Sequence, residues 1–333
     1  MEPAPALDAP ESSTRTVRPE TVEAPQPPIA WRAYARLAKL DIYDYYLSIP
    51  LLAAMLVPAG WAVPGRTAGV LLLTLLGQVG IVAALVTFDD VTGFRDGSDA
   101  ANYGPDAPAR RLARKPLVAG TLTEPQAIRF GWLAVGACAV FWAGAVALAP
   151  ARPAWAVAGV VVWTVLGFQY TWWLKLSYHG MQELFMAALG WFFVLPFYGL
   201  LTGRAEGFIV VQTLLFGLGP LLFGVYSNIN DIPGDRAVNR PTVAVVASPR
   251  VNALFIAAVS ALEAGLIVGS VATGLAPWWF LVAMAPVIVL RIRQYVQGIV
   301  RGEVLRARRL GIHVSRLAAA LLIAVNLVHG VLA

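Results

Sequence analysis

Long apolar stretches recur along this chain, and their length constrains the fold more than any other feature. Each runs for roughly 18–25 residues, which as an α-helix is long enough to cross a hydrocarbon core of about 30 Å. Of the 333 residues, 58% are hydrophobic and only 13% are charged, whereas soluble proteins carry roughly 25% charged residues. Polar surface is too scarce for a water-soluble globule, so we predict an all-α, polytopic membrane protein.

We place nine membrane-spanning helices in the sequence. An odd number of spans puts the two ends of the chain on opposite sides of the membrane. Interior Gly and Pro residues do not argue against these spans, because neighbouring helices satisfy the backbone groups that they leave open. The nine predicted spans lie near residues 43–63, 68–90, 126–149, 153–173, 181–202, 207–229, 251–273, 276–296 and 312–332.

The N-terminal part of the chain differs from the rest. Residues 1–30 are rich in Pro, with Ala, Glu, Ser and Thr between the prolines and little periodicity. A segment of this composition cannot bury enough apolar area to offset the entropy lost on ordering, so we predict a disordered tail. It does not begin with basic residues followed by an apolar run, which a secretory signal peptide requires. Residues 31–333 are predicted to form one membrane domain.

Basic residues indicate the orientation. With the N-terminus inside, the predicted outer loops hold only Arg66, Arg152 and Arg204 of the 25 Lys and Arg residues. Cytoplasmic loops carry such an excess of positive charge, so we predict a multi-pass protein of the cell's inner membrane. Its N-terminus and two long loops, 91–125 and 230–250, are then cytoplasmic. The net charge of +6 therefore reflects topology and contact with anionic membrane lipid, and we expect no nucleic-acid partner.

Sulfur and imidazole ligands are scarce in the sequence. Cys138 is the single cysteine, so neither a disulfide nor a CxxC metal site is available. The three histidines stand at unrelated spacings, which argues against a histidine-built zinc site. Candidate chemistry therefore rests on the carboxylates, which are costly at membrane depth and tend to be functional there.

Two short acidic clusters lie at the inner ends of the second and sixth predicted spans. In the first, Asp89 and Asp96 are seven residues apart and share a face if the helix continues. In the second, Asp231 follows Asn228 by three residues and precedes Asp235 by four. Pro and Gly directly after Asp231 predict that regular helix does not continue there, so Asp235 would reach inward from a turn.

Two carboxylate clusters that face each other across the mouth of a bundle form a site for hard divalent cations. Mg²⁺ takes one or two carboxylates, keeps several waters and uses substrate phosphate oxygens as further ligands. Basic side chains nearby would contact the same phosphate oxygens; those of the two loops are Arg114, Lys115, Arg236 and Arg240. The alternative is that the acids only balance the basic charge of the inner loops. Two clusters at helical spacing, each followed by Lys-Pro or Arg-Pro, favour the metal site.

These residues resemble the UbiA superfamily of intramembrane prenyltransferases, and most closely its branch that prenylates 1,4-dihydroxy-2-naphthoate. The family has nine membrane helices, with an NDxxDxxxD-type motif after the second and a DxxxD motif after the sixth. The second motif here is Ser227-Asn228-Ile229-Asn230-Asp231 with Asp235 and Asn239-Arg240-Pro241-Thr242. Two further stretches fit: Lys115 to Thr123 resembles the family's RPxxSGxLS segment, and Tyr178 to Glu183 resembles its Y-x-G-x-G-E segment.

The first motif departs from the family pattern. In the branch's NDxxDxxxGxD pattern, Asp90, Gly97 and Asp99 fit. Asp89 stands where the family has Asn, and Gly93 where it has the middle Asp, while Asp96 is an additional acid. An alternative register pairs Asp89 with Asp96 instead. The family's frequent Arg-Pro near the first helix is also missing, and Asp41-Ile-Tyr-Asp44 stands in its place. These changes leave the acceptor substrate more open than the diphosphate chemistry.

The resemblance implies that Mg²⁺ bridges the clusters to an isoprenyl diphosphate and neutralises the leaving charge as the C–O bond breaks. An apolar, aromatic chamber would shield the allyl cation. The implied metal ligands are Asp89, Asp90, Asp96, Asp99, Asn228, Asp231 and Asp235, and we expect Asp90, Asp96, Asp231 and Asp235 to be essential for catalysis. The implied substrate-binding residues are Arg114, Lys115, Arg236, Arg240, Tyr178 and Glu183. For Glu183, a role as an ordering hydrogen-bond partner and a role in the acceptor site remain open.

Three functions follow as hypotheses. The first is Mg²⁺-dependent transfer of a prenyl group to an acceptor, either aromatic or quinonoid, within the membrane. The second is a membrane terpene cyclase that ionises the same diphosphate without an acceptor, which the altered first motif permits. The third is a cation transporter. Acids at only the inner mouth argue against it, because transporter sites lie near the midplane of the bilayer.

Overall fold

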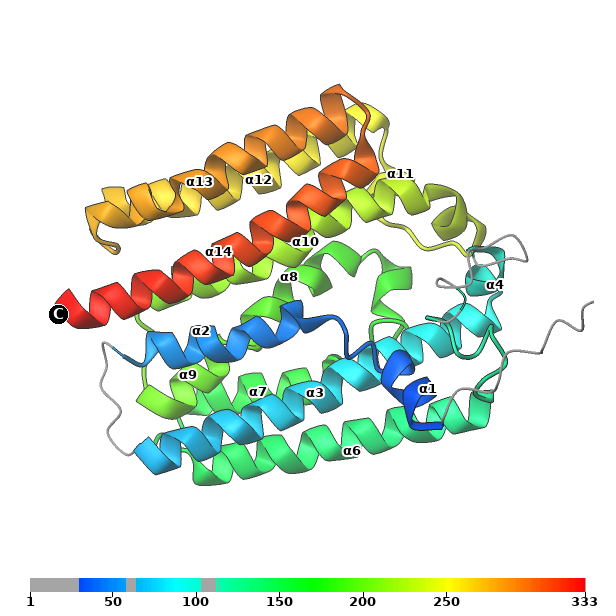
Figure 1. Cartoon of the computed structure of the whole chain (residues 1–333), viewed down its shortest axis with the longest axis horizontal. Helices are drawn as coiled ribbons and strands as arrows, with labels where there is room; N and C mark the ends of the chain where they lie inside the picture. Colours follow the sequence, from blue (N-terminus) through cyan, green and yellow to red (C-terminus); the bar gives the residue numbers. More distant parts are fainter. Residues whose placement is uncertain (1–29, 58–63, 103–111, 113, 333) are drawn as a thin grey trace, which may run out of the picture.

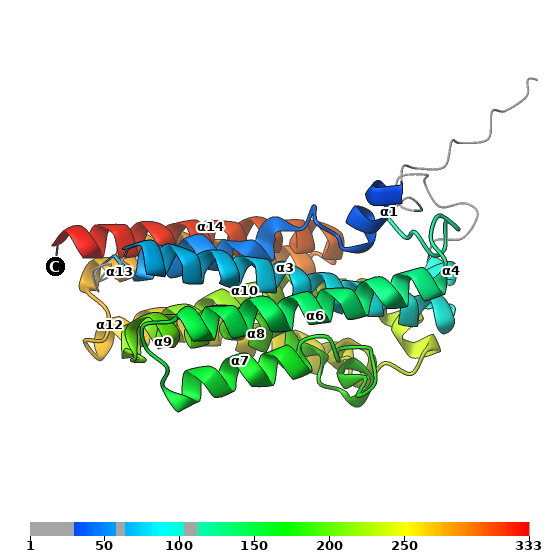
Figure 2. The ribbon, with the colours of Figure 1, turned by 90° about the horizontal axis from the view of Figure 1, so that it is seen from below.

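A computed structural model describes residues 30–57, 64–102, 112 and 114–332 of the chain. Apart from Ala30, the predicted tail of residues 1–30 lies outside the described residues. The described part is helical and contains no strand, and its long helices run side by side along one axis (Figures 1 and 2). Its elements are α1 (Ala30–Leu37), η1 (Tyr43–Leu47), α2 (Ser48–Met55), α3 (Pro64–Arg95), α4 (Ser98–Asn102), α6 (Glu124–Leu148), α7 (Ala154–Leu166), η2 (Leu176–His179), α8 (Gln182–Phe192), α9 (Leu195–Thr202), α10 (Gly207–Ala237), α11 (Val243–Val246), α12 (Pro249–Ala272), α13 (Trp278–Tyr295), the π-helical turn η3 (Val296–Val300) and α14 (Val304–Leu332).

Seven helical segments of the described chain are long and apolar enough to cross a membrane. The all-α membrane fold is therefore confirmed, but a count of nine spans is not. Two predicted spans are shorter in the structure. The first comprises η1 and α2, and residues 58–63 of its predicted range are not described. The fourth, α7, has 13 residues and gives way at Gly167 to an irregular segment.

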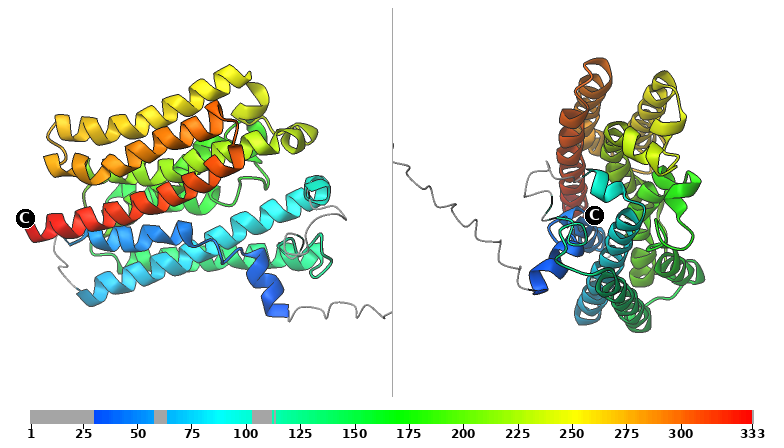
Figure 3. Two further views of the ribbon diagram at one scale, coloured as in Figure 1. Left: turned by 45° about the horizontal axis from the view of Figure 1, so that its top comes forward. Right: turned by 90° about the vertical axis from the view of Figure 1, so that its right-hand side faces the viewer.

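Small residues let the helices approach each other closely, as is common in membrane bundles. A Cβ atom at Gly80 of α3 would lie 2.8 Å from the Ala134 carbonyl oxygen of α6. A Cβ at Gly217 of α10 would lie 2.4 Å from the Ala187 carbonyl oxygen of α8. The backbones of these pairs are therefore in contact. In the bundle, α12, α13 and α14 lie on one side and α3, α6 and α7 on the other (Figures 1 and 3).

Two helices continue past their apolar parts at the same end of the bundle. α3 runs to Arg95 and α10 to Ala237, which corrects the prediction that α10 loses regularity after Asp231. Pro233 is exposed, and α10 continues past it even though proline lacks the N–H that would bond the preceding turn. α1 and α4 lie at this end, whereas α14 finishes at the opposite end (Figure 1). We call the end that carries α1 and α4 the acidic end.

Candidate functional site

The two acidic clusters face each other across a cleft at the acidic end. Asp89 of α3 and Asp99 of α4 line one side, and Asp231 and Asp235 of α10 line the other. Arg240, from the segment after α10, also lines this cleft, which has a volume of about 100 Å³. The clusters are 130 or more residues apart in the chain, yet the parallel ends of α3 and α10 bring them together.

The Asp99 carboxylate packs directly against Gly93 of the first motif. A Cβ atom built at Gly93 would lie 2.8 Å from Cγ of Asp99 and 2.9 Å from its Oδ2. The absence of a side chain at Gly93 is therefore what allows the Asp99 carboxylate to lie against α3. In this arrangement the motif's last acid, on α4, lies beside position 93.

Two lysines neutralise part of this cluster. The Lys115 ammonium lies 2.9 Å from Oδ1 of Asp90 and 2.7 Å from the Asp99 carboxylate. Lys39, directly after α1, lies 2.9 Å from the same Asp90 oxygen. Asp90 is only 2% exposed, and its other oxygen, Oδ2, is buried without a hydrogen-bond partner in the described structure. That oxygen keeps its acceptor capacity, although Asp90 is not among the residues that line the cleft.

Burial and neighbouring charges both shift the pKa values of this cluster. Burial raises the pKa of Asp99 to about 6; Lys115 works against this shift, and the neighbouring Asp90 and Asp89 add to it. Burial alone would lower the pKa of Lys115, but the charges of Asp90 and Asp99 raise it above its usual value. A divalent cation would relieve the same repulsion between carboxylates.

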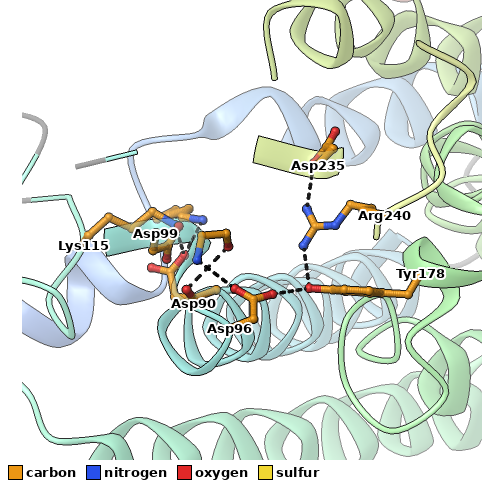
Figure 4. A network of polar contacts seen from close by, with 10 residues as sticks. Asp90, Asp96, Asp99, Lys115, Tyr178, Asp235 and Arg240 are labelled. Atoms are coloured by element: carbon orange, nitrogen blue, oxygen red, sulfur yellow. Dashed lines mark hydrogen bonds and ion pairs between the residues drawn. The ribbon is translucent and has the colours of Figure 1, made fainter. Parts of the chain in front are cut away.

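A chain of polar contacts connects the two sides of the cleft (Figure 4). The Tyr178 hydroxyl donates a hydrogen bond of 2.6 Å to Asp96 and accepts one of 3.2 Å from Arg240. Arg240 in turn lies 3.8 Å from Oδ1 of Asp235. Burial raises the pKa of Asp96, but the hydrogen bonds from Tyr178 and Ser98 outweigh it and keep that pKa below its usual value. Asp96 is therefore held ionised.

Glu183 and Gln182 hold Asn228 of the second motif. Oε1 of Glu183 accepts hydrogen bonds of 3.0 Å from the Asn228 amide and from the Val243 backbone N–H. Gln182 donates a hydrogen bond of 2.7 Å to Oδ1 of Asn228. Both ends of the Asn228 amide are thus engaged by α8. In this geometry Glu183 orders α10 and the start of α11, while Asn228 turns its carbonyl oxygen toward Gln182.

The structure does not bring all the predicted basic residues to the cleft. Arg114 forms an ion pair with Asp41 on the exposed rim, and Arg236 is exposed on α10. Conversely, sequence reasoning missed Lys39 and Gln182. Gln182 lies inside the segment that resembles the family's Y-x-G-x-G-E pattern, next to Glu183, so the motif could have pointed to Gln182 as a site residue. The sequence around Lys39 has no motif that could have pointed to it.

The residues fit Mg²⁺ only if the substrate completes the site. Within the described residues, no three Asp, Glu, His or Cys side chains converge on a position that could hold a metal ion. Basic groups stand between the acids instead, with Lys115 between Asp90 and Asp99 and Arg240 beside Asp235. Mg²⁺ binds through few carboxylates and uses phosphate oxygens and water for the rest. The oxygen-only donor set and the unpaired Oδ2 of Asp90 suit that mode.

Comparison with solved structures supports the fold. Digeranylgeranylglyceryl phosphate synthase superposes with a TM-score of 0.63 at 14% identity, covering 90% of this chain and 99% of that one. A UbiA homologue from Aeropyrum pernix K1 gives 0.62 at 17% identity, with 85% and 98% covered. One from Archaeoglobus fulgidus, bound to DMAPP and Mg²⁺, gives 0.59 at 18% identity, with 88% and 98% covered.

Sequence comparison places the chain in a family. No curated protein matches the sequence significantly. The sequence pattern of one family, however, matches residues 47–314 and so spans every helix from α2 to the first part of α14. Because this match covers most of the chain and both acidic clusters, the protein belongs to the UbiA prenyltransferase family.

Proposed function

We propose that the protein transfers a prenyl group from an isoprenyl diphosphate to an aromatic or quinonoid acceptor within the membrane, and that the reaction depends on Mg²⁺. One observation carries this proposal: carboxylates of α3 and α4 face those of α10 across a cleft that also contains Arg240. Relatives of the same fold bind DMAPP or GPP together with Mg²⁺, which is the ligand that such a cleft suits.

In this proposal each side of the cleft has its own task. Asp89, Asp90 and Asp99 would hold Mg²⁺ from one side, and Asp231 and Asp235 from the other. When bound, Mg²⁺ would neutralise the charge that develops on the departing diphosphate. Lys115 and Arg240 would contact the phosphate oxygens, and Tyr178 orients Asp96 and Arg240 through its hydrogen bonds.

The apolar interior shields the allyl cation from water. Trp163 stacks on Phe192 with ring centroids 4.7 Å apart, and Trp163 also lies 5.0 Å from Phe185. Tyr170, 5.1 Å from Phe185, extends this aromatic group toward the charged cleft. Aromatic faces stabilise cations and exclude water, so the allyl cation would react with the acceptor before water could capture it.

The proposal includes the topology. Adding η1–α2 and α7 to the seven long segments gives nine crossings, which agrees with α1 and the end of α14 lying at opposite ends of the bundle (Figure 2). We place the acidic end in the cytoplasm and the protein in the inner membrane because the acidic end carries most of the basic residues. The 1,4-dihydroxy-2-naphthoate branch remains the proposed subfamily.

Terpene cyclisation is the second candidate. It is favoured by the absence of the Arg-Pro sequence near the first helix, where Asp44 instead forms a two-point ion pair of 2.6 and 3.0 Å with Arg316 of α14. A cyclase would use the same diphosphate cleft and would need no acceptor. A cation path is disfavoured, because the carboxylates that line the cleft lie at one end of the bundle.

Product analysis distinguishes these functions. The purified full chain is incubated in detergent with Mg²⁺ and geranyl, farnesyl or geranylgeranyl diphosphate, with and without 1,4-dihydroxy-2-naphthoate or 4-hydroxybenzoate. A prenylated acceptor supports the transferase, and a hydrocarbon formed without acceptor supports the cyclase. Asp235→Asn should lower diphosphate release at least ~100-fold, whereas Asp41→Asn on the exposed rim should not. Diphosphates that stay intact at all chain lengths would refute both candidates.

A further inference from the structure

A cavity lies at the end of the bundle opposite the acidic end, where α10 begins and α14 finishes (Figure 1). Its volume is about 450 Å³, within the range of small-molecule sites. Two short connections contribute to its rim, residues 203–206 between α9 and α10 and residues 273–277 between α12 and α13. We call it the distal cavity. Its polar lining residues are Tyr198, Arg204, Glu206, Asn326 and His329.

The distal cavity opens at the level of a membrane surface. Trp278 directly follows Pro277 of the rim and is 74% exposed. Trp155, at the start of α7, is also exposed. Exposed tryptophans of membrane proteins collect at the interface between hydrocarbon and water. The nearest molecules to the cavity are therefore membrane lipids, with their headgroups at the height of the rim.

The rim carries one charge of each sign. Nε of Arg204 lies 3.3 Å from Oε1 of Glu206, and the two side chains are 62% and 47% exposed. An ion pair this exposed contributes little to stability, so a ligand can compete with it. A purely anionic ligand would meet the Glu206 carboxylate, and a purely cationic one would meet the Arg204 guanidinium. A ligand that carries both charges a few bonds apart matches both side chains.

The floor of the cavity offers a hydrogen-bond acceptor and no donor. Asn326 is 1% exposed, and both of its N–H groups are used, in hydrogen bonds to Gln212 at 2.5 Å and to the Leu322 carbonyl oxygen at 2.8 Å. Its own carbonyl oxygen accepts one hydrogen bond, of 3.2 Å, from Gln212. An amide oxygen accepts two, so one acceptor position remains. A primary ammonium has N–H groups to donate there, whereas a quaternary ammonium has none.

Apolar side chains stand beside these polar groups. Phe208, Leu275 and Pro277 line the cavity, and Leu275 is 51% exposed. The two connections of the rim approach closely here, because a Cβ atom at Gly207 would lie 2.8 Å from Cδ2 of Leu275. Apolar surface next to a pair of opposite charges favours an amphipathic ligand.

We propose that the distal cavity binds one phospholipid whose headgroup carries a primary ammonium, as that of phosphatidylethanolamine does. The phosphate faces Arg204, the ammonium faces Glu206 and Asn326, and the chains leave past Phe208 and Leu275 into the bilayer. A lipid in this position connects α2, α9, α10 and α14, all of which line the cavity. The inference does not depend on the proposed function, because the diphosphate cleft lies at the other end of the bundle.

Lipid binding tests this inference. The full chain is purified in detergent and freed of lipid, and native mass spectrometry then counts the short-chain lipids that it retains. We expect one phosphatidylethanolamine per chain, with phosphatidylcholine and phosphatidylglycerol bound at least ~10-fold more weakly, because neither can donate charge-assisted N–H hydrogen bonds. Glycerophosphoethanolamine, which has the headgroup without the chains, should compete at least ~10-fold more weakly because it buries no chain.

Two variants separate the two charges. Glu206→Gln should weaken phosphatidylethanolamine binding about tenfold and leave phosphatidylglycerol binding equal or tighter. Arg204→Gln should weaken the binding of both lipids about tenfold, because both carry the phosphate. Arg152→Gln is the matched control: Arg152 is exposed between α6 and α7 at the same end, contacts the Ala147 carbonyl oxygen and does not line the cavity. Its lipid binding should equal that of the wild type, and thermal unfolding verifies that each variant is folded.

Four outcomes would overturn the inference: no retained phosphatidylethanolamine, equal binding of the three lipids, wild-type binding by both Glu206→Gln and Arg204→Gln, or equal competition by glycerophosphoethanolamine. The last outcome would assign the cavity to a soluble phosphate ester instead of a lipid. Diphosphate release is measured on the same samples and should be unchanged in Glu206→Gln. Its absence in the wild type would refute the proposed function and leave the lipid result as it stands.

Discussion

At the scale of single residues, the contact between Asp99 and Gly93 is the clearest consequence of the departure from the family pattern at position 93. The structure places the Asp99 carboxylate where a side chain at position 93 would lie. Position 93 therefore contributes no acid of its own, and the Asp99 carboxylate uses the space that its side chain would take.

A positional swap tests whether a carboxylate at position 93 can take over from that of Asp99. Asp99→Gly should lower diphosphate release about 100-fold, because one carboxylate of the metal site is lost. Adding Gly93→Asp in the same chain places a carboxylate in the same space and should recover most of that loss. Gly93→Asp alone should be worse than the double variant, because its Cβ would lie 2.8 Å from Cγ of Asp99. Equal rates for Asp99→Gly and the double variant would show that position 93 cannot take over this role.

Lys115 provides a second prediction, on stability. Its ammonium contacts Asp90 and Asp99 within 2.9 Å, and the Lys115 side chain is about 10% exposed. Lys115→Met leaves two buried carboxylates without this charge, and the loss of one partner from a buried pair costs about 3–5 kcal/mol. We expect a lower melting temperature without Mg²⁺ and a partial recovery on adding Mg²⁺, measured in detergent by light scattering or intrinsic fluorescence. As the control, Lys115→Arg should keep a melting temperature close to that of the wild type. If Mg²⁺ does not raise the melting temperature of Lys115→Met, the result would argue against cation binding at this cluster.

At the scale of helices, the contact of α8 with α10 determines where the second acidic cluster lies. Gly190 and Gly217 are in backbone contact: a Cβ at Gly190 would lie 2.6 Å from the Gly217 Cα. Because α8 also carries the residues that hold Asn228, a shift here would move the cluster. Gly217→Val should therefore abolish diphosphate release and lower stability. Gly136→Ala on α6, where a Cβ meets nothing within 4 Å, should be neutral or gain up to ~1 kcal/mol from helix propensity.

A buried ion pair joins α12 and α13 to the back of α10. Arg291 contacts Glu263 at 2.8 and 3.1 Å, and Gln294 donates a 2.9 Å hydrogen bond to the Leu222 carbonyl oxygen. Both ions are 3% exposed or less. Glu263→Leu or Arg291→Leu alone should cost about 3–5 kcal/mol, because the remaining charge is left without its partner in the bundle. The double leucine variant should be more stable than either single variant, which a thermal double-mutant cycle measures; additive losses would show that the pair is not coupled.

At the scale of the whole molecule, the length of the apolar stretches and the positions of the charged residues predicted most of the fold. The helices could be predicted from apolar length because each segment must by itself be long enough to cross the bilayer. The acids were found because charge is rare in such a chain. What the sequence did not reveal depends on contacts between segments that local rules do not cover: the position of Asp99 over Gly93 and the ion pair of Lys39 with Asp90. The helical continuation through Pro233 was missed because local rules disfavour proline inside a helix, and the rest of the structure can override such a preference.

Orientation is the property of the whole molecule that the proposed function most needs, because water-soluble isoprenyl diphosphate must reach the acidic end from the cytoplasm. Cys138 is buried in α6 and is the chain's single cysteine, so Cys138→Ala gives a background without thiols. On this background, Arg236→Cys at the acidic end and Arg204→Cys at the opposite end introduce one exposed thiol each. A membrane-impermeant maleimide should label position 204 in intact cells stripped of any outer wall, and position 236 only in inverted vesicles. The labelling follows from the bias of positive charge toward the acidic end. The reverse pattern would put the diphosphate cleft outside the cell and refute the proposed supply of donor.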